Sequence, residues 1–176
     1  AVDLWSASTC AHQPDFADNF EGDGIISAVD YCHERGVRAY ITLNTLVFDR
    51  ELCDALVFAE QLYRIGVDAV LVQDLGLAGL IRRNLPELTL HASTQMGIHD
   101  LGGLQYCKRI GLTRAVLARE TSLAQIKYLS NNCDIELETF AHGALCMTFP
   151  EAVCIPRCPV SAAATEAHAL SLVERT

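Results

Sequence analysis

The chain has 176 residues, of which 51% are hydrophobic and 20% charged, so it is long enough for one globular domain with a buried core. Its formal net charge of −9 excludes a generally basic nucleic-acid-binding surface, although a local basic patch remains compatible with it. No apolar run is long enough to cross a bilayer, and the first residues lack the pattern of a secretory signal. We therefore expect a cytoplasmic protein without a membrane span.

Short β-rich runs alternate with amphipathic stretches of helical period along the middle of the chain. In chain order, we predict helix 24–35, strand 38–44, helix 49–65, strand 68–73, helix 77–84, strand 88–92, helix 101–110, strand 114–118, helix 122–131 and strand 135–141. Gly36, Gly66 and Gly111 follow three of these helices, where a C-terminal glycine is expected. Ser122 is placed to act as the N-cap of the last helix.

The predicted strands are nearly continuous apolar runs, such as Ala69-Val70-Leu71-Val72, and do not alternate. This pattern is typical of a parallel sheet that is covered on both faces. Five strand–helix repeats of similar length predict an α/β fold, namely an incomplete (β/α) barrel of the triosephosphate-isomerase (TIM) type with parallel strands and outer helices. A doubly wound open sheet is the alternative, but no Gly-rich phosphate loop follows the first strand.

Two further sets of residues are expected to pack in the core. The helix over 49–65 is predicted to bury one apolar stripe, which consists of Leu52, Leu56, Ala59, Leu62 and Tyr63. Four cysteines lie in or at the ends of helix-like stretches and are expected to act as small hydrophobes rather than in disulfides: Cys32, Cys53, Cys107 and Cys133.

Polar side chains follow the predicted strands, at the end of the sheet where both candidate folds place their chemistry. They are Thr42, Asn44, Gln73, Asp74, His91, Ser93, Thr94, Gln95, Arg119, Glu120, Glu138, His142 and Cys146. Some of these residues could have a structural role instead of a functional one, because Asp74 and Ser93 can cap helices and Arg119 can form a local ion pair with Glu120. Five successive strands that end in this way nevertheless predict a pocket at that rim.

The residue types at the rim allow three kinds of chemistry, and the sequence alone leaves them open. Zinc could be held by His91, Glu138, His142 and Cys146, although the close ligand pairs of zinc sites are missing. His142 could activate Cys146 as a nucleophile, but no sequence feature identifies an oxyanion hole. Cys146 could also be one ligand of an iron–sulfur cluster, which would need three more thiolates.

Six short segments between about residues 19 and 149 carry a specific combination of motifs. They are His33-Glu34-Arg35-Gly36-Val37, Ile41-Thr42-Leu43-Asn44-Thr45, Gly66-Val67-Asp68-Ala69-Val70-Leu71-Val72-Gln73-Asp74, His91-Ala92-Ser93-Thr94-Gln95-Met96, Leu117-Ala118-Arg119-Glu120 and His142-Gly143-Ala144-Leu145-Cys146. The combination resembles peptidase family U32, the collagenase-like peptidases. This resemblance implies a catalytic region similar to a (β/α) barrel.

The resemblance also implies a substrate, a cofactor and a set of site residues. The family label implies cleavage of collagen-like or other peptides, whereas several members are similar to iron–sulfur proteins that support hydroxylation of RNA bases or of a quinone precursor. We expect catalytic roles for His91, Arg119, Glu120, Glu138 and His142. Substrate-binding roles are expected for Asn44, Asp74, Ser93 and Gln95, and a metal-ligand role for Cys146.

The sequence departs from the family signature after Phe149. The signature continues with aromatic–Ser–Gly–x–Cys and later with Asn-Arg-Gly-x-Cys-x-x-Pro-Cys. Back-translation of residues 150–161 and 164–174 with a one-base shift restores both elements. We therefore expect residues 1–149 to form a partial (β/α)-barrel domain and residues 150–176 to be an out-of-frame tail that packs poorly.

Three expectations follow for the polypeptide as it stands. The cluster is expected in the intact family member but not here, because Cys154 and Cys158 fall in the shifted frame. Catalysis by this chain is expected to be weak or absent. The first strand of the family barrel is not recognised ahead of residue 19, and a missing strand would leave an open barrel edge through which copies of the chain could self-associate.

Overall fold

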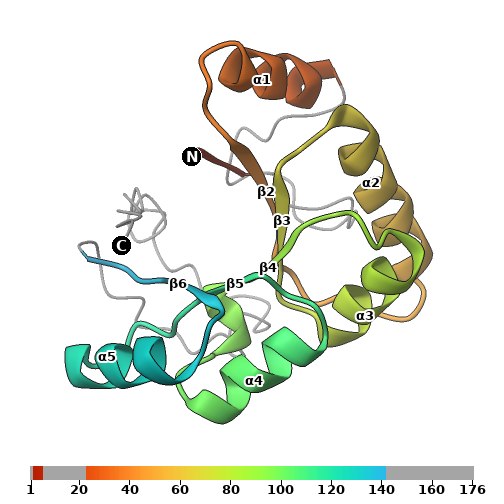
Figure 1. Cartoon of the computed structure of the whole chain (residues 1–176). Coiled ribbons are helices and arrows are strands. Elements are labelled where there is room, and N and C mark those ends of the chain that lie inside the picture. The colour runs from red at the N-terminus through yellow and green to blue at the C-terminus, as the bar shows by residue number, and fades with distance from the viewer. Residues whose placement is uncertain (1, 6–22, 142–176) are drawn as a thin grey trace, which may run out of the picture.

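The computed structural model of the chain describes residues 2–5 and 23–141, and in these ranges strands and helices alternate (Figure 1). The elements are β1 (Val2–Trp5), α1 (Asp23–His33), β2 (Ala39–Leu43), α2 (Leu52–Ile65), β3 (Ala69–Val72), α3 (Leu75–Asn84), β4 (Leu90–Ala92), the 3-10 helix η1 (Thr94–Met96), α4 (Leu101–Arg109), β5 (Arg114–Val116), α5 (Leu123–Asn132) and β6 (Glu136–Glu138). Every helix and strand predicted from the sequence is present, with ends that differ by a few residues.

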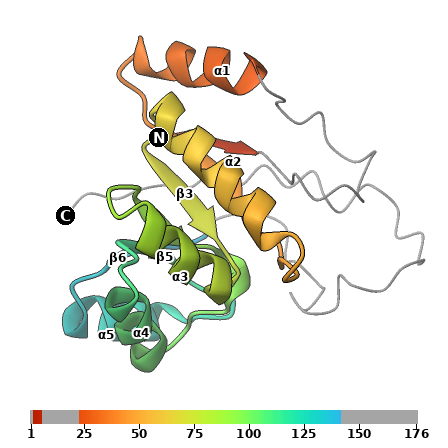
Figure 2. The same cartoon turned by 90° about the vertical axis from the view of Figure 1, so that its right-hand side faces the viewer.

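The strands form one six-stranded sheet in which spatial order equals sequence order, from β1 to β6, and every neighbouring pair is parallel. This succession is the arrangement of a (β/α) barrel, whereas a doubly wound sheet would reverse its strand order at a switch point. The helices follow the outer, convex side of the curved sheet (Figure 1), and α2 and α3 lie in front of β3 when the molecule is turned (Figure 2). The predicted incomplete (β/α) barrel is confirmed.

The expectation that the first strand is missing is wrong. Val2–Trp5 forms β1, which pairs in parallel with β2, and Val2 lies opposite Ala39. The run is short and contains the charged residue Asp3, so the pattern of apolar residues did not reveal it. In the described ranges β1 and β6 are therefore the two edge strands.

The main core lies between the sheet and the helices. Alternate strand residues point outward, as the period of two requires, and Ile41, Val70 and Leu90 are at most 1% exposed there. A smaller cluster on the opposite, interior face contains Tyr40, Ala69, Leu71 and Val116, with Phe140 packed against it. Because both faces are buried, the strands read as continuous apolar runs.

Local signals fix the ends of several helices. Gly66 has φ +87° and its N–H donates to the carbonyls of Leu62 and Tyr63, which ends α2 in a left-handed cap. Gly111 has φ +86°, and a Cβ there would lie 2.8 Å from Nε of Arg82, so both conformation and space favour glycine. The Ser122 hydroxyl accepts from the Gln125 N–H and caps α5 as predicted.

Two expectations about the core need correction. Tyr63 is 42% exposed, and Ala55 takes the buried place beside Ala59 and Leu62, because the face of α2 that meets the sheet is rotated relative to the predicted stripe. Cys53 is exposed at the start of α2. Cys32 and Cys107 are buried, as expected for small hydrophobic side chains in the core, and Cys133 is half-buried.

Candidate active site

The carboxyl-terminal ends of all six strands lie at one edge of the sheet because every pair is parallel. The predicted rim positions are at this edge: Asn44 follows β2, Asp74 follows β3, Ser93 follows β4, Arg119 and Glu120 follow β5, and Glu138 ends β6. These six residues therefore lie at one rim, as predicted, whereas His91, which was expected there too, lies within β4. Their catalytic or binding roles stay predictions.

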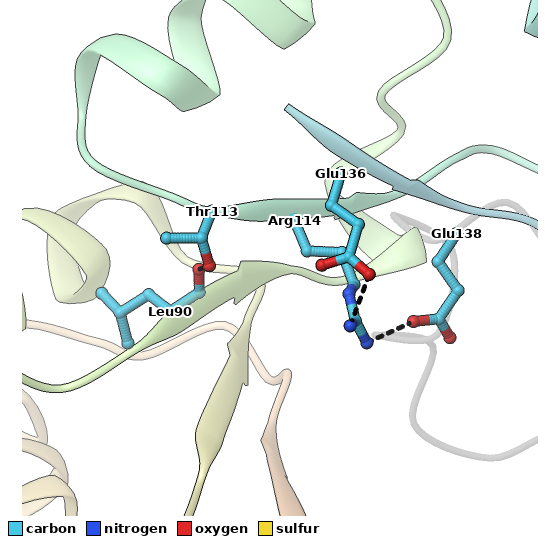
Figure 3. A network of polar contacts seen from close by, with 5 residues as sticks. All are labelled: Leu90, Thr113, Arg114, Glu136 and Glu138. Atoms are coloured by element: carbon cyan, nitrogen blue, oxygen red, sulfur yellow. Dashed lines mark hydrogen bonds and ion pairs between the residues drawn. The ribbon is translucent and has the colours of Figure 1, made fainter. Parts of the chain in front are cut away.

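Arg114, the first residue of β5, is the centre of a charged network on the interior face (Figure 3). One guanidinium nitrogen donates to Glu136 Oε1 at 2.8 Å, and the other lies 3.3 Å from Glu138 Oε2. The side chain of Arg114 is only 5% exposed, and that of Glu138 is 10% exposed. Thr113, just before β5, connects the start of this strand to β4, because its N–H donates to the Leu90 carbonyl at 3.0 Å.

The guanidinium of Arg114 stays charged in this setting. Burial by itself would lower the pKa of Arg114, but the hydrogen bond that Arg114 donates to Glu136 and the nearby Tyr40, Glu136 and Glu138 outweigh it and raise that pKa. A buried cation of this kind is tolerated because two carboxylates neutralise it. Its Nε, which is also buried, has no hydrogen-bond partner in the structure.

His91 lies next to this network, in the middle of β4 and 5% exposed. Its ring meets the ring of Tyr40 edge-on, with 5.1 Å between the centroids, and the same Tyr40 ring lies 5.2 Å from the Arg114 guanidinium carbon. Burial first, and the charge of Arg114 second, lower the pKa of His91 from 6.5 to about 3. His91 is therefore an uncharged imidazole at neutral pH.

The other predicted binding residues are divided between the interior and the helix ends. Asn44 donates weakly to the Ser93 hydroxyl at 3.4 Å, so these two rim residues meet. Asp74 instead caps α3, because its carboxylate accepts from the Leu77 N–H at 2.7 Å. Gln95 is exposed on η1, and its N–H lies 3.4 Å from the Ser93 hydroxyl. Asp74 and Ser93 therefore both cap helices, as the structural alternative predicted, and Ser93 also accepts from Asn44.

Arg119 and Glu120 form the turn after β5. The guanidinium carbon of Arg119 lies 4.4 Å from the ring centre of Phe140, a cation–π contact that links the loop after β5 with the segment after β6. Glu120 is exposed. Arg119 and Phe140 therefore belong to the same part of the rim.

The metal hypotheses depend partly on residues that the structure does not describe. His142 and Cys146 lie outside the described residues, as does the tail over 150–176, so the predictions for them remain predictions. Within residues 2–5 and 23–141, no group of three or more His, Cys, Asp or Glu side chains could hold a metal ion. Two of the cysteines in those ranges, Cys32 and Cys107, are buried in the core between the sheet and the helices.

Comparison with known proteins establishes the family. The model of peptidase family U32 matches residues 12–166 of the chain. The chain belongs to peptidase family U32. The helices that the structure describes contain none long and apolar enough to cross a membrane.

Several U32 relatives have names that refer to RNA. The chain is 39% identical over 125 residues to the 23S rRNA 5-hydroxycytidine C2501 synthase of Escherichia coli (strain K12). The matched region covers 71% of the chain and 19% of that protein. The chain is 32% identical over 133 residues to tRNA hydroxylation protein P1 of Bacillus subtilis (strain 168), covering 76% of the chain and 32% of the relative.

Other relatives carry peptidase names. A protein of Porphyromonas gingivalis (strain ATCC BAA-308 / W83) named collagenase is 28% identical over 142 residues, covering 74% of the chain and 34% of the relative. The solved structure of the U32 peptidase Mk0906 matches with a TM-score of 0.58 and 17% identity over 68% of the chain and 51% of that structure, which supports the fold. The chain spans about a fifth to a third of these three curated relatives.

Sequence reasoning missed three residues of this U32 site: Tyr40, Arg114 and Glu136. All three lie within strands, whereas the search for polar residues concentrated on the positions after strands. One signal could have found the network, because Glu136 and Glu138 stand two residues apart and therefore share one face of the last strand. Glu138 is mostly buried, and a buried carboxylate calls for a nearby cation, which Arg114 provides.

Proposed function

We propose that this chain is a segment of a U32 protein that supports hydroxylation of an RNA base. The observation that carries the proposal is the 39% identity with a 23S rRNA 5-hydroxycytidine synthase, together with the tRNA hydroxylation proteins among the relatives. A cytoplasmic location is proposed with it, since cellular RNA is the substrate class. The segment by itself is expected to have little or no activity, because it spans a fifth of that relative.

The chemistry of the rim and the interior face is compatible with a nucleobase as the ligand. Phe140 and the Arg119 guanidinium offer planar surfaces of the kind on which unstacked bases rest. His91 is uncharged and the charge of Arg114 is matched by carboxylates, so the interior suits a neutral polar group better than a phosphate. Buried polar atoms normally have partners, yet Thr42 Oγ1 and Arg114 Nε have none in this structure.

Peptide hydrolysis is the second candidate, favoured by the names of the Porphyromonas gingivalis collagenase and of the U32 peptidase Mk0906. It lacks a nucleophile pair in the part of the chain that the structure describes. Ser93 lies two residues after His91 on the same face, but its hydroxyl accepts from Asn44 and lies near the Gln95 N–H. No hydrogen bond between Ser93 and His91 is found there, as an activated serine would require.

We also propose that the intact, frame-corrected protein holds an iron–sulfur cluster with Cys146 as one ligand. The proposal rests on the soft thiolates that such clusters require and on the cysteines that the shifted frame restores. Anaerobic purification should give a brown protein with bound iron and sulfide. Cys146→Ser should lower the iron content, whereas Cys53→Ser, an exposed cysteine on α2, should not.

The proposed function is tested by complementation. The frame-corrected gene is expressed in two Escherichia coli strains, one that lacks the 23S rRNA 5-hydroxycytidine synthase and one that lacks tRNA hydroxylation protein P. Hydroxylated nucleosides of rRNA and tRNA are measured by mass spectrometry. We expect hydroxylated bases to be restored in one of the two RNA classes. The purified protein is assayed in parallel on collagen-like peptides. Peptide cleavage without any RNA hydroxylation would overturn the proposal in favour of the peptidase.

A further inference from the structure

Arg114 is a buried charged residue of the interior face that the sequence motifs did not single out. Its guanidinium contacts Glu136 and Glu138 on β6 and faces the ring of Tyr40 on β2, which in turn meets His91 on β4. One side chain thereby connects three strands. Two of the residues reached in this way, His91 and Glu138, are among the five predicted from sequence to be catalytic.

We propose that Arg114 is a positioning residue of this site, whose guanidinium fixes the carboxylate of Glu138 and, through the ring of Tyr40, the place of His91. The inference rests on the proposed function for its reaction, but its geometry does not. Glu138 is the more buried of the two carboxylates, at 10% side-chain exposure against 51% for Glu136. The planar fork of arginine can hold both carboxylates at once, which a single ammonium group cannot do in the same geometry.

The arrangement gives Glu138 and His91 different roles. One oxygen of Glu138 accepts from the Arg114 guanidinium, which fixes the carboxyl group so that it can accept a hydrogen bond from a substrate N–H or O–H. His91 remains neutral, so one ring nitrogen can donate and the other can accept a hydrogen bond. Without the guanidinium, Glu138 would lose the partner that fixes its carboxyl group, and one of the two causes that lower the pKa of His91 would be removed.

Three variants of the intact protein separate this role from a purely structural one. Arg114→Met removes the charge, Arg114→Lys keeps the charge but not the fork, and Arg114→Met with Glu138→Gln removes both buried charges so that a folded protein is obtained. Lys108→Met is the control, since it removes an exposed ion pair with Asp134 at 2.6 Å on the outer side of the fold. Circular dichroism identifies the variants that fold.

The first readout is the titration of His91, which is monitored by NMR in the same purified proteins and needs no RNA. The pKa of His91 should rise in Arg114→Met and in the double variant, because the charge of Arg114 is the second cause, after burial, that lowers it. It should stay close to the parent value in Arg114→Lys and Lys108→Met. An unchanged pKa in every folded Arg114 variant would overturn the inference.

The second readout is the yield of hydroxylated nucleoside in the complemented strain. Hydroxylation should fall about a hundredfold in Arg114→Met, as expected for misplaced reacting groups, fall less in Arg114→Lys and stay unchanged in Lys108→Met. Normal hydroxylation in Arg114→Met would overturn the positioning role even if the titration shifts. If the parent protein hydroxylates no RNA, the proposed function fails, and the titration alone decides whether Arg114 controls His91.

Discussion

The state of His91 illustrates how strand position sets the chemistry of a residue. Exposed on a loop, it would titrate near neutral pH. In β4 its side chain is buried against Tyr40 and lies close to Arg114, and both burial and charge disfavour the imidazolium. The same residue that the sequence marks as a candidate acid or base is therefore a neutral hydrogen-bonding group in the fold.

This shift predicts how stability depends on pH. The pKa of His91 is lowered in the folded state, so between pH 6.5 and about 3 the unfolded chain binds the proton and the folded chain does not. The contribution of His91 is complete above pH 6.5 and is lost as the pH falls toward 3, by about 1.4 kcal/mol per pH unit at most. In His91→Gln, the free energy of unfolding should therefore fall less steeply as the pH is lowered below 6.5.

Urea unfolding at a series of pH values measures this effect. His99→Gln is the control, because His99 is exposed and its ring forms a hydrogen bond with the Gly97 carbonyl. Its profile should follow that of the parent chain. A His91→Gln profile as steep as the parent's below pH 6.5 would show that His91 does not resist protonation in the fold.

At the scale of single elements, the sequence predicted the positions of strands and helices well because burial on both faces leaves an unmistakable pattern. Ala69–Val72 is entirely buried and was predicted almost to its ends. The interior network escaped prediction for a physical reason. The burial of Arg114 depends on Glu136 and Glu138, which are 22 and 24 residues away in the sequence and become neighbours only through the parallel pairing of β5 with β6.

The helix caps show the same limit at the rim. Asp74 was predicted to bind substrate, yet its carboxylate accepts from the Leu77 N–H and begins α3. Asp100 does the same for α4 with the Gly103 N–H. A carboxylate after a strand therefore has two explanations that sequence alone cannot separate, because the N-cap of a following helix and a rim residue occupy the same position.

Substitution of Asp74 separates the two explanations. Asparagine can still cap the helix, so Asp74→Asn should keep the stability of the chain, whereas Asp74→Ala should lose about 1 kcal/mol. If Asp74 serves only as a cap, hydroxylation by the frame-corrected protein should also survive in Asp74→Asn. Asp100→Asn and Asp100→Ala are the matched pair at the next helix. A loss of activity in Asp74→Asn without loss of stability would reveal a binding role for the carboxylate.

At the scale of the whole molecule, the strand order leaves β1 and β6 as the edge strands of the described sheet. The described sheet runs from β1 to β6 without pairing these two strands to each other. The last strand pairs with β5 through the Glu136 N–H and the Glu138 carbonyl. Since backbone groups alternate in direction along a strand, the N–H and carbonyl of Leu137 point away from β5, toward the open edge.

Self-association through this edge is the consequence that we predict. An edge strand can pair with a strand of another copy, and Leu137→Pro would remove the outward N–H without disturbing the bonds to β5. Sedimentation velocity over a range of concentrations should show association of the parent chain and a shift toward monomer in Leu137→Pro. Leu137→Ala is the control, because it shortens the side chain but keeps the amide, and it should associate like the parent. Equal association of the proline and alanine variants would place the contact elsewhere on the molecule.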